Sequence, residues 1–158
     1  MSDPGYAALQ AEAEAEGLRI TVGALVFDDA GRVFVHRRGF DRPLFPGCWD
    51  IVGGHLEPGE TILEALAREV EEETGWRVVG RPILVHVADW KGRREFDFLV
   101  DVDGDLGNPR LEVPEHIEFR WVEPHELLQL DETGYVDEAL ITRLVELAAG
   151  RLERHPGG

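Results

Sequence analysis

Apolar and polar side chains alternate along several short segments of the chain, which is the pattern of half-buried β-strands. These segments are rich in β-branched and aromatic residues, and Gly, Pro and Asp separate them. They predict strands at residues 18–27, 32–37, 49–52, 81–90, 94–102 and 118–122. The first two flank the turn sequence Asp28-Asp29-Ala30-Gly31, so we expect them to form a β-hairpin.

The segment at residues 61–74 carries the strongest helix signal. Thr61 and Glu64 have the spacing of a capping box, and Gly75 follows the last apolar position. A loosely held surface helix is expected at 6–16, a helical turn at 124–128 and a C-terminal helix at 135–149. The apolar stripe of the C-terminal helix consists of Val136, Leu140, Leu144 and Leu147. The elements together predict a mixed α/β fold.

The chain has 158 residues, of which 43% are hydrophobic, and this length and composition fit one globular domain. We expect a helical extension at 1–17, the domain itself at 18–150 and a polar tail at 151–158. Neither a secretory leader nor a membrane-spanning segment is expected from the apolar pattern. The single cysteine, Cys48, allows no intrachain disulfide, which favours a cytoplasmic location.

The charge of the chain restricts its ligands. It carries 32 acidic against 16 basic side chains, a formal net charge of -16. Such a surface repels nucleic acids and anionic membranes, so neither is an expected partner. A small phosphate compound would need a local source of positive charge, and a divalent metal is the usual one.

Three carboxylates fall on one face of the helix predicted at 61–74. At about 100° per residue, Glu69, Glu72 and Glu73 share an arc of about 100° that borders the apolar stripe. Carboxylates this close repel one another, and they lie near the helix end that disfavours anions. A bare run of glutamates is most often a solvated acidic face. The residues around this run change that interpretation.

The segment from Gly54 to Trp76 resembles the signature of the Nudix hydrolase family, G-x5-E-x7-R-E-U-x-E-E-x-G-U, where U is a bulky apolar residue. The seven fixed positions and the two apolar positions are filled by Gly54, Glu60, Arg68, Glu69, Val70, Glu72, Glu73, Gly75 and Trp76. The resemblance extends over residues 18–149. It implies an α/β/α sandwich with a mixed central sheet.

The resemblance also implies a metal site and roles for its residues. Glu69, Glu72, Glu73 and the carbonyl of Gly54 are then the ligands of Mg²⁺, with Mn²⁺ as the alternative. Arg68 would hold a carboxylate of the motif in place, and Glu60 would brace the loop against the helix. Within the motif, Glu69 or Glu72 would be the general base.

The base in some family members comes from a later loop. Glu115 and Glu118 are the candidates here, and the alternative is that both are surface carboxylates without a catalytic role. Arg38 occupies a position where many members bind phosphate with an arginine, a residue type that suits phosphate. Trp49 is a candidate for stacking on a base, as are Phe45 and Trp90, although aromatic residues more often fill cores.

The histidines show no spacing typical of metal ligands. They are His36, His55, His86, His116, His125 and His155. We interpret His86 and His125 as structural.

The resemblance implies hydrolysis of a nucleoside diphosphate derivative, a small-molecule nucleotide substrate. No marker of the NADH, ADP-ribose, diadenosine polyphosphate or coenzyme A subclasses is present. The expected reaction is therefore cleavage of a nucleoside triphosphate, including oxidised or noncanonical ones, to monophosphate and pyrophosphate. ADP-ribose or a nucleotide sugar is the alternative substrate. An isomerase on the same fold and a noncatalytic nucleotide sensor are rivals from other classes. A homodimer is left open.

Overall fold

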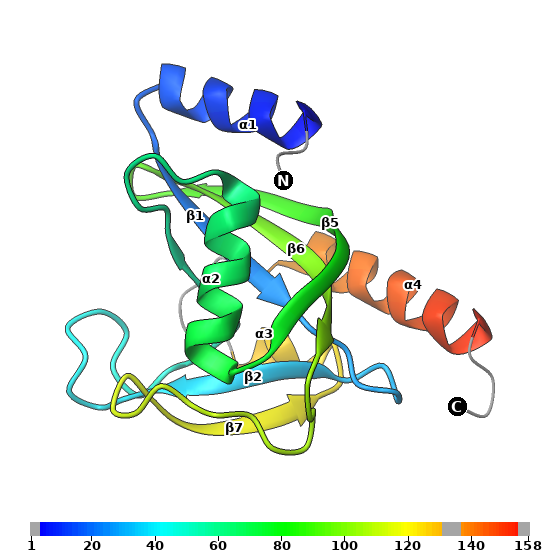
Figure 1. Cartoon of the computed structure of the whole chain (residues 1–158). Helices are drawn as coiled ribbons and strands as arrows, with labels where there is room; N and C mark the ends of the chain where they lie inside the picture. Colours follow the sequence, from blue (N-terminus) through cyan, green and yellow to red (C-terminus); the bar gives the residue numbers. More distant parts are fainter. Residues whose placement is uncertain (1–3, 131–136, 155–158) are drawn as a thin grey trace.

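The computed structural model describes residues 4–130 and 137–154 (Figure 1). In chain order the elements are α1 Pro4–Ala15, β1 Arg19–Leu25, β2 Val33–Arg38, β3 Trp49–Asp50, β4 Val52–His55, α2 Ile62–Thr74, β5 Arg77–Trp90, β6 Arg93–Asp103, β7 His116–Val122, α3 Glu126–Leu130 and α4 Glu138–Arg154. None of the described helices is long and apolar enough to cross a membrane.

The strands form two sheets, one in the order β4-β1-β6-β5 and the other in the order β3-β2-β7. Strands β1 and β6 are parallel, whereas the other pairs are antiparallel. The mixed α/β fold predicted from the sequence, with its mixed sheet, is therefore confirmed.

Two strand predictions need correction. The expected hairpin is confined to the residues next to its turn, where Phe27 and Val33 form an antiparallel bridge and the amides of Asp28 and Phe34 donate to the carbonyls of Arg32 and Val26. Beyond the turn, β1 pairs with β4 on one side and β6 on the other, and β2 pairs with β3 and β7. The single strand expected at 49–52 divides at Ile51 into β3 and β4, which belong to different sheets.

Helix α2 covers one face of the four-stranded sheet, and α3 and α4 belong to a second apolar cluster. Alternation along β6 sorts its side chains between the two faces. Phe96 and Phe98 belong to the cluster around α2, whereas Leu99 packs in the cluster of Leu140 and Leu144 from α4. Glu95 and Asp97 share the face of Leu99, so carboxyl groups occupy part of the sheet face opposite α2.

The N-terminal helix is held more firmly than predicted. Tyr6 and Ala13 are buried in the cluster around α2. The Tyr6 hydroxyl donates to the carbonyl of Pro82 at 2.8 Å and accepts from the amide of Leu84 at 3.3 Å, which fixes α1 to β5. Composition alone missed this because Tyr6 is the one large aromatic side chain in a segment otherwise rich in Ala and Glu.

The C-terminal helix also differs from its prediction. Residues 135 and 136, where it was expected to begin, lie outside the described residues. As described, α4 begins at Glu138 and continues to Arg154, beyond the predicted end at residue 149.

Candidate active site

Helix α2 begins and ends as its sequence predicts. The Thr61 side chain accepts from the amide of Glu64, and the Glu64 side chain accepts from the amide of Thr61. Gly75 adopts the left-handed conformation at φ 77°, and its amide donates to the carbonyl of Glu71. These two ends fix which side chains of the helix face the sheet and which face solvent.

The three predicted carboxylates of α2 lie in different environments. The side chain of Glu73 is 5% exposed, that of Glu69 is 13% exposed and that of Glu72 is 47% exposed. Glu69 lies directly against Gly54, where an added Cβ would lie 2.5 Å from Glu69 Oε1. Only glycine at position 54 lets the strand approach this carboxylate so closely.

Arg68 connects the helix to the loop before it. Its guanidinium donates to Glu60 Oε2 at 2.8 Å, to Glu69 Oε1 at 2.8 Å and to the carbonyl of His55 at 3.0 Å. A fourth contact reaches Glu72 Oε2 at 3.2 Å. The fork of donors on one arginine therefore fixes the position of Glu69 relative to the loop.

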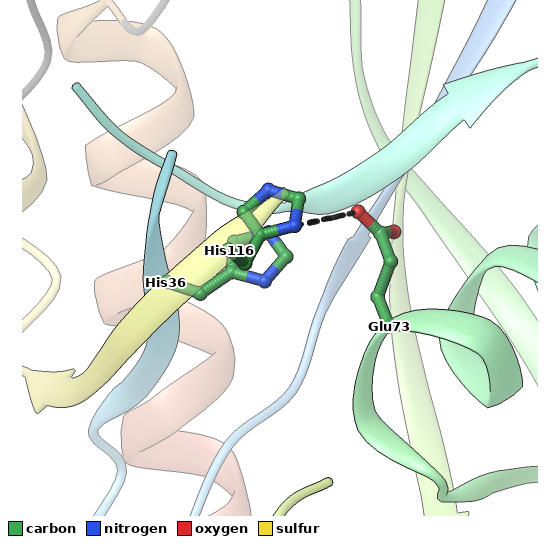
Figure 2. A group of neighbouring side chains, drawn as sticks. All are labelled: His36, Glu73 and His116. Atoms are coloured by element: carbon green, nitrogen blue, oxygen red, sulfur yellow. Dashed lines mark ion pairs between the residues drawn. The ribbon is translucent and has the colours of Figure 1, made fainter. Parts of the chain in front are cut away.

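Glu73 points from α2 toward two stacked histidines (Figure 2). The rings of His36 and His116 lie 3.4 Å apart at an angle of 8°. Glu73 Oε1 is 3.8 Å from His36 Nε2 and 3.7 Å from His116 Nδ1, while its Oε2 accepts from the amide of Gly53 at 2.9 Å. Asp50 Oδ1 lies near the same rings, 3.0 Å from His36 Nε2 and 3.4 Å from His116 Nε2.

The histidine pair carries no signal in the sequence, because its two members are far apart in the chain. His36 lies on β2 and His116 on β7, and only the pairing of these strands brings them together. His36, Glu73 and His116 have ligand atoms within 4.8 Å of one another, so they are one group of described residues that could hold a metal ion.

The electrostatics of the site favour a bound cation. Burial raises the pKa of Glu73 well above its usual value, and the neighbouring Glu69 and Asp50 raise it further. Burial also raises the pKa of Glu69, and together with contributions from Glu72 and Glu112 it outweighs the opposing effect of Arg68. Crowded, partly buried carboxylate oxygens are the donors that hard divalent cations prefer, so the residues present fit such an ion.

Asp50 is buried as well, but its pKa is lowered and not raised. Burial alone would raise the pKa of this carboxyl, but contacts from His116 and His36 outweigh burial and hold the pKa well below the usual range. Asp50 also accepts from Arg38 Nη1 at 3.2 Å. It is therefore an anion that joins the histidine pair to an arginine.

The segment before β7 carries one carboxylate that the sequence analysis did not select. Glu112 raises the pKa of Glu69, and its own pKa is raised by burial, by Glu115 and by Glu72. Glu118 instead pairs with Arg37 at 2.9 Å and is half exposed. Of these acidic side chains, Glu112 is the one that interacts with the carboxylates of α2. In the sequence, its position in a polar loop is the only sign of such a role.

A cleft of about 270 Å³ opens beside Gly53 and Gly54. Arginine side chains line it at three positions, Arg38, Arg42 and Arg93. These guanidinium groups supply local positive charge in a chain whose net charge is -16.

Two of the three aromatic residues considered for stacking on a base lie at the cleft. Phe45 and Trp90 line the cleft. Trp49 lies on β3, where the guanidinium groups of Arg37 and Arg120 stack on its ring at 5.9 and 5.6 Å. A planar ligand in this cleft would therefore meet Phe45 and Trp90.

A family model described as the NUDIX domain matches residues 17–144. The match covers most of the chain, and the chain therefore belongs to the Nudix family. Together with its curated relatives, this match makes the protein a Nudix hydrolase, an enzyme.

Named relatives agree with this assignment. The chain is 33% identical over 128 residues to the nucleoside triphosphatase NudI of Escherichia coli K12, a match that covers 72% of this chain and 87% of the relative. The MutT protein of Methanosarcina mazei has a similar structure, with a TM-score of 0.60 and 26% identity over 89% of this chain and 96% of that one. A MutT Nudix hydrolase of Burkholderia pseudomallei has a similar structure, with a TM-score of 0.57 and 26% identity over 82% of this chain and 97% of that one.

Proposed function

We propose that the protein hydrolyses a nucleoside triphosphate to the monophosphate and pyrophosphate in the presence of Mg²⁺ or Mn²⁺. The observation that carries this proposal is the arginine-lined cleft that reaches Gly53 and Gly54, the two residues that contact Glu73 and Glu69 of α2. Similarity to the nucleoside triphosphatase NudI supports a triphosphate over ADP-ribose or a nucleotide sugar.

Glu69, Glu73 and the carbonyl of Gly54 would hold the cation, and Glu72 would complete the set from its more exposed position. A bound divalent ion neutralises phosphate charge and lowers the pKa of a water molecule. Arg68 contributes by fixing the Glu69 carboxylate at 2.8 Å, so that the ligand is already oriented before the ion arrives.

Arg38 is positioned to bind a substrate phosphate. It lines the cleft, and its Nε donates to the carbonyl of Leu44 at 2.8 Å, which holds the guanidinium in place. Its contact with Asp50 at 3.2 Å would be shared with or replaced by a phosphate oxygen.

Glu72 is our choice of general base. It is half exposed and therefore accessible to water, and its carboxylate contacts Arg68 at 3.2 Å. Glu118 is a weaker choice because its carboxylate is engaged by Arg37, and Glu115 remains a second choice beside Glu112. Glu72→Gln should lower kcat strongly, whereas Glu118→Gln should leave kcat within a few-fold of wild type.

The experiment that tests the reaction is a panel of nucleotides with Mg²⁺, read by chromatography of the products. The panel contains ribo- and deoxyribonucleoside triphosphates, oxidised triphosphates, ADP-ribose and nucleotide sugars. We expect monophosphate and pyrophosphate from triphosphates. Turnover of ADP-ribose a hundredfold more efficient than that of every triphosphate would overturn the proposal. Tight binding without turnover of any compound would favour a sensor.

The cellular location follows as part of the same proposal. Cys48 is the single cysteine of the sequence, so no intrachain disulfide can form, which fits a reducing compartment. We therefore place the reaction in the cytoplasm, where nucleoside triphosphates are abundant.

A further inference from the structure

Two buried polar side chains lie next to each other where the cleft meets the four-stranded sheet. Thr21 on β1 and Glu95 on β6 are paired in register on adjacent strands. They are 4% and 7% exposed, and both line the cleft. The Thr21 hydroxyl donates to Glu95 Oε1 at 3.5 Å, which is long for a hydrogen bond between oxygens. Both groups therefore retain capacity to bond a ligand.

Glu95 is an uncharged carboxyl at neutral pH. Burial raises its pKa to about 10, and the neighbouring carboxyl of Asp97 adds to the effect. Asp97 Oδ2 lies 3.2 Å from His86 Nδ1, a contact that holds the Asp97 side chain in place.

Glu95 has a carboxyl oxygen that can still bond a ligand. Glu95 Oε2 and Asp97 Oδ1 are buried without a hydrogen-bond partner among the described residues. The long contact with Thr21 is made by the other oxygen of Glu95, so Oε2 keeps its full capacity for a ligand. Burying polar groups in this state is costly unless a ligand or water completes them.

Two aromatic rings stand at the same cleft. The ring centroids of Phe45 and Trp90 are 6.1 Å apart. The backbone of Phe45 is in the left-handed region at φ 48°, a conformation that costs a non-glycine residue about 1 kcal/mol or more. The ammonium of Lys91 lies 5.6 Å from the Phe45 ring, and the guanidinium of Arg93 lies 5.0 Å from the Trp90 ring. The two rings are thus held at the cleft by contacts from the β5–β6 turn.

We propose that this part of the cleft is the subsite for the nucleobase, in which Thr21 and Glu95 bond the edge of the base while Phe45 and Trp90 contact its faces. The proposal rests on the proposed function and adds the residues that set base preference. A hydroxyl beside a neutral carboxyl offers both a donor and an acceptor. That pair is complementary to a base edge in which an N–H adjoins a carbonyl or a ring nitrogen.

A base fits this subsite better than a phosphate does. A neutral carboxyl gives no electrostatic attraction to a polyanion, whereas the guanidinium groups of Arg38 and Arg42, which also line the cleft, do attract phosphate. Aromatic faces near a donor–acceptor pair match a flat heterocycle and not a tetrahedral group.

The test compares substrates with and without a base. kcat/KM is measured for the four ribonucleoside triphosphates and for methyl triphosphate in wild type, Thr21→Val, Glu95→Leu and Glu95→Gln, with Asp103→Asn as the control. Asp103 lies on the same strand as Glu95 but is exposed and paired with Arg77. Glu95→Gln keeps a donor and an acceptor, so it separates hydrogen bonding from loss of the side chain.

We expect Thr21→Val and Glu95→Leu to lower kcat/KM for the preferred nucleotide about tenfold to a hundredfold, because each leaves a base atom without its partner. The same variants should leave methyl triphosphate unchanged, and Glu95→Gln and the control should stay within a few-fold of wild type. Equal losses on methyl triphosphate would overturn the proposal, and so would unchanged kcat/KM on every nucleotide.

A binding measurement separates this proposal from the proposed function. Saturation-transfer NMR with free nucleosides, which carry no phosphate, reports the base subsite in a protein that turns nothing over. If wild type hydrolyses no triphosphate but binds nucleosides, and Glu95→Leu abolishes that binding, the reaction is wrong and the subsite stands. Absence of nucleoside binding in wild type, together with full triphosphate turnover that ignores the base, would leave the reaction and overturn the subsite.

Discussion

Replacing Gly54 by alanine should separate activity from stability in this enzyme. The added Cβ would lie 2.5 Å from Glu69 Oε1 and 2.6 Å from Glu69 Cδ, well inside the normal contact distance. The carboxylate must therefore retreat by about 1 Å, since contacts of this kind are stable only near 3.5 Å. Because Gly54 is not in the left-handed region, alanine fits its backbone, and the flexible end of Glu69 can move at small cost.

The retreat would pull Glu69 from Arg68 and from the proposed metal position. A misplacement of about 1 Å in a catalytic group typically costs about a hundredfold in rate. We expect Gly54→Ala to lose about that factor in kcat and to bind Mn²⁺ more weakly, with an apo melting temperature near that of wild type.

Steady-state kinetics, Mn²⁺ titration by electron paramagnetic resonance and calorimetry of the apo protein provide the three readouts. Gly107→Ala is the matched control, because its Cβ would meet only Asp105 at an ordinary 3.5 Å. Wild-type kcat and Mn²⁺ affinity in Gly54→Ala would refute the reasoning. A steep drop in melting temperature would show that the strand, and not Glu69, absorbs the added atom.

Further outcomes follow from the same site. Glu73→Gln should lower kcat about a hundredfold or more at saturating Mg²⁺, and because it removes a buried carboxylate repelled by its neighbours, the apo melting temperature should stay the same or rise. Glu71→Gln, on the exposed face, should change kcat by less than a few-fold. Equal losses of kcat in the two variants would contradict a positioned metal site. Excess EDTA should abolish turnover, and Mg²⁺ should raise the melting temperature; turnover that persists in EDTA would rule out the metal requirement. For Glu95, the native pKa is about 10 against 4.5 for the unfolded chain, so the native state binds one more proton between these values and the contribution of this group to stability falls as pH rises through that window. Glu95→Gln has no group that titrates here, so its free energy of unfolding should rise relative to that of wild type between pH 5 and pH 9, by at most about 1.4 kcal/mol per pH unit. Chemical denaturation measures this difference, and a difference that does not change with pH would show that the native carboxyl is already ionised.

Local sequence rules predicted the parts of the site that depend on neighbours in the chain. The capping box at Thr61, the end of α2 at Gly75 and the placement of Glu73 beside the apolar stripe each depend on residues within one or two helical turns. Helical periodicity therefore distinguished Glu73, which is buried, from Glu71, which is exposed.

Groups assembled by distant strands could not be predicted in this way. His36 and His116 meet because β2 pairs with β7, with a shift in register between Arg37 and Arg38. Thr21 and Glu95 meet because β1 and β6 are parallel neighbours. An alternation of apolar residues identifies a strand and its faces, but it carries no information on which strand lies beside it. The hairpin predicted along the full length of its two strands has the same origin.

The hold of α1 on β5 has a consequence for how the protein behaves in concentrated solution. Strand β5 is the outer strand of its sheet, and Val79, Ile83 and Val87 along it are 40–44% exposed. An outer strand with unpaired backbone groups and apolar side chains is a template on which a second chain can add its own strand. Tyr6 occupies two of those backbone groups, at Pro82 and Leu84, in the stretch where the pairing of β5 with β6 is irregular. Tyr6 thus blocks strand addition at these two backbone groups, and a shortened chain starting at Arg19 should self-associate with rising concentration.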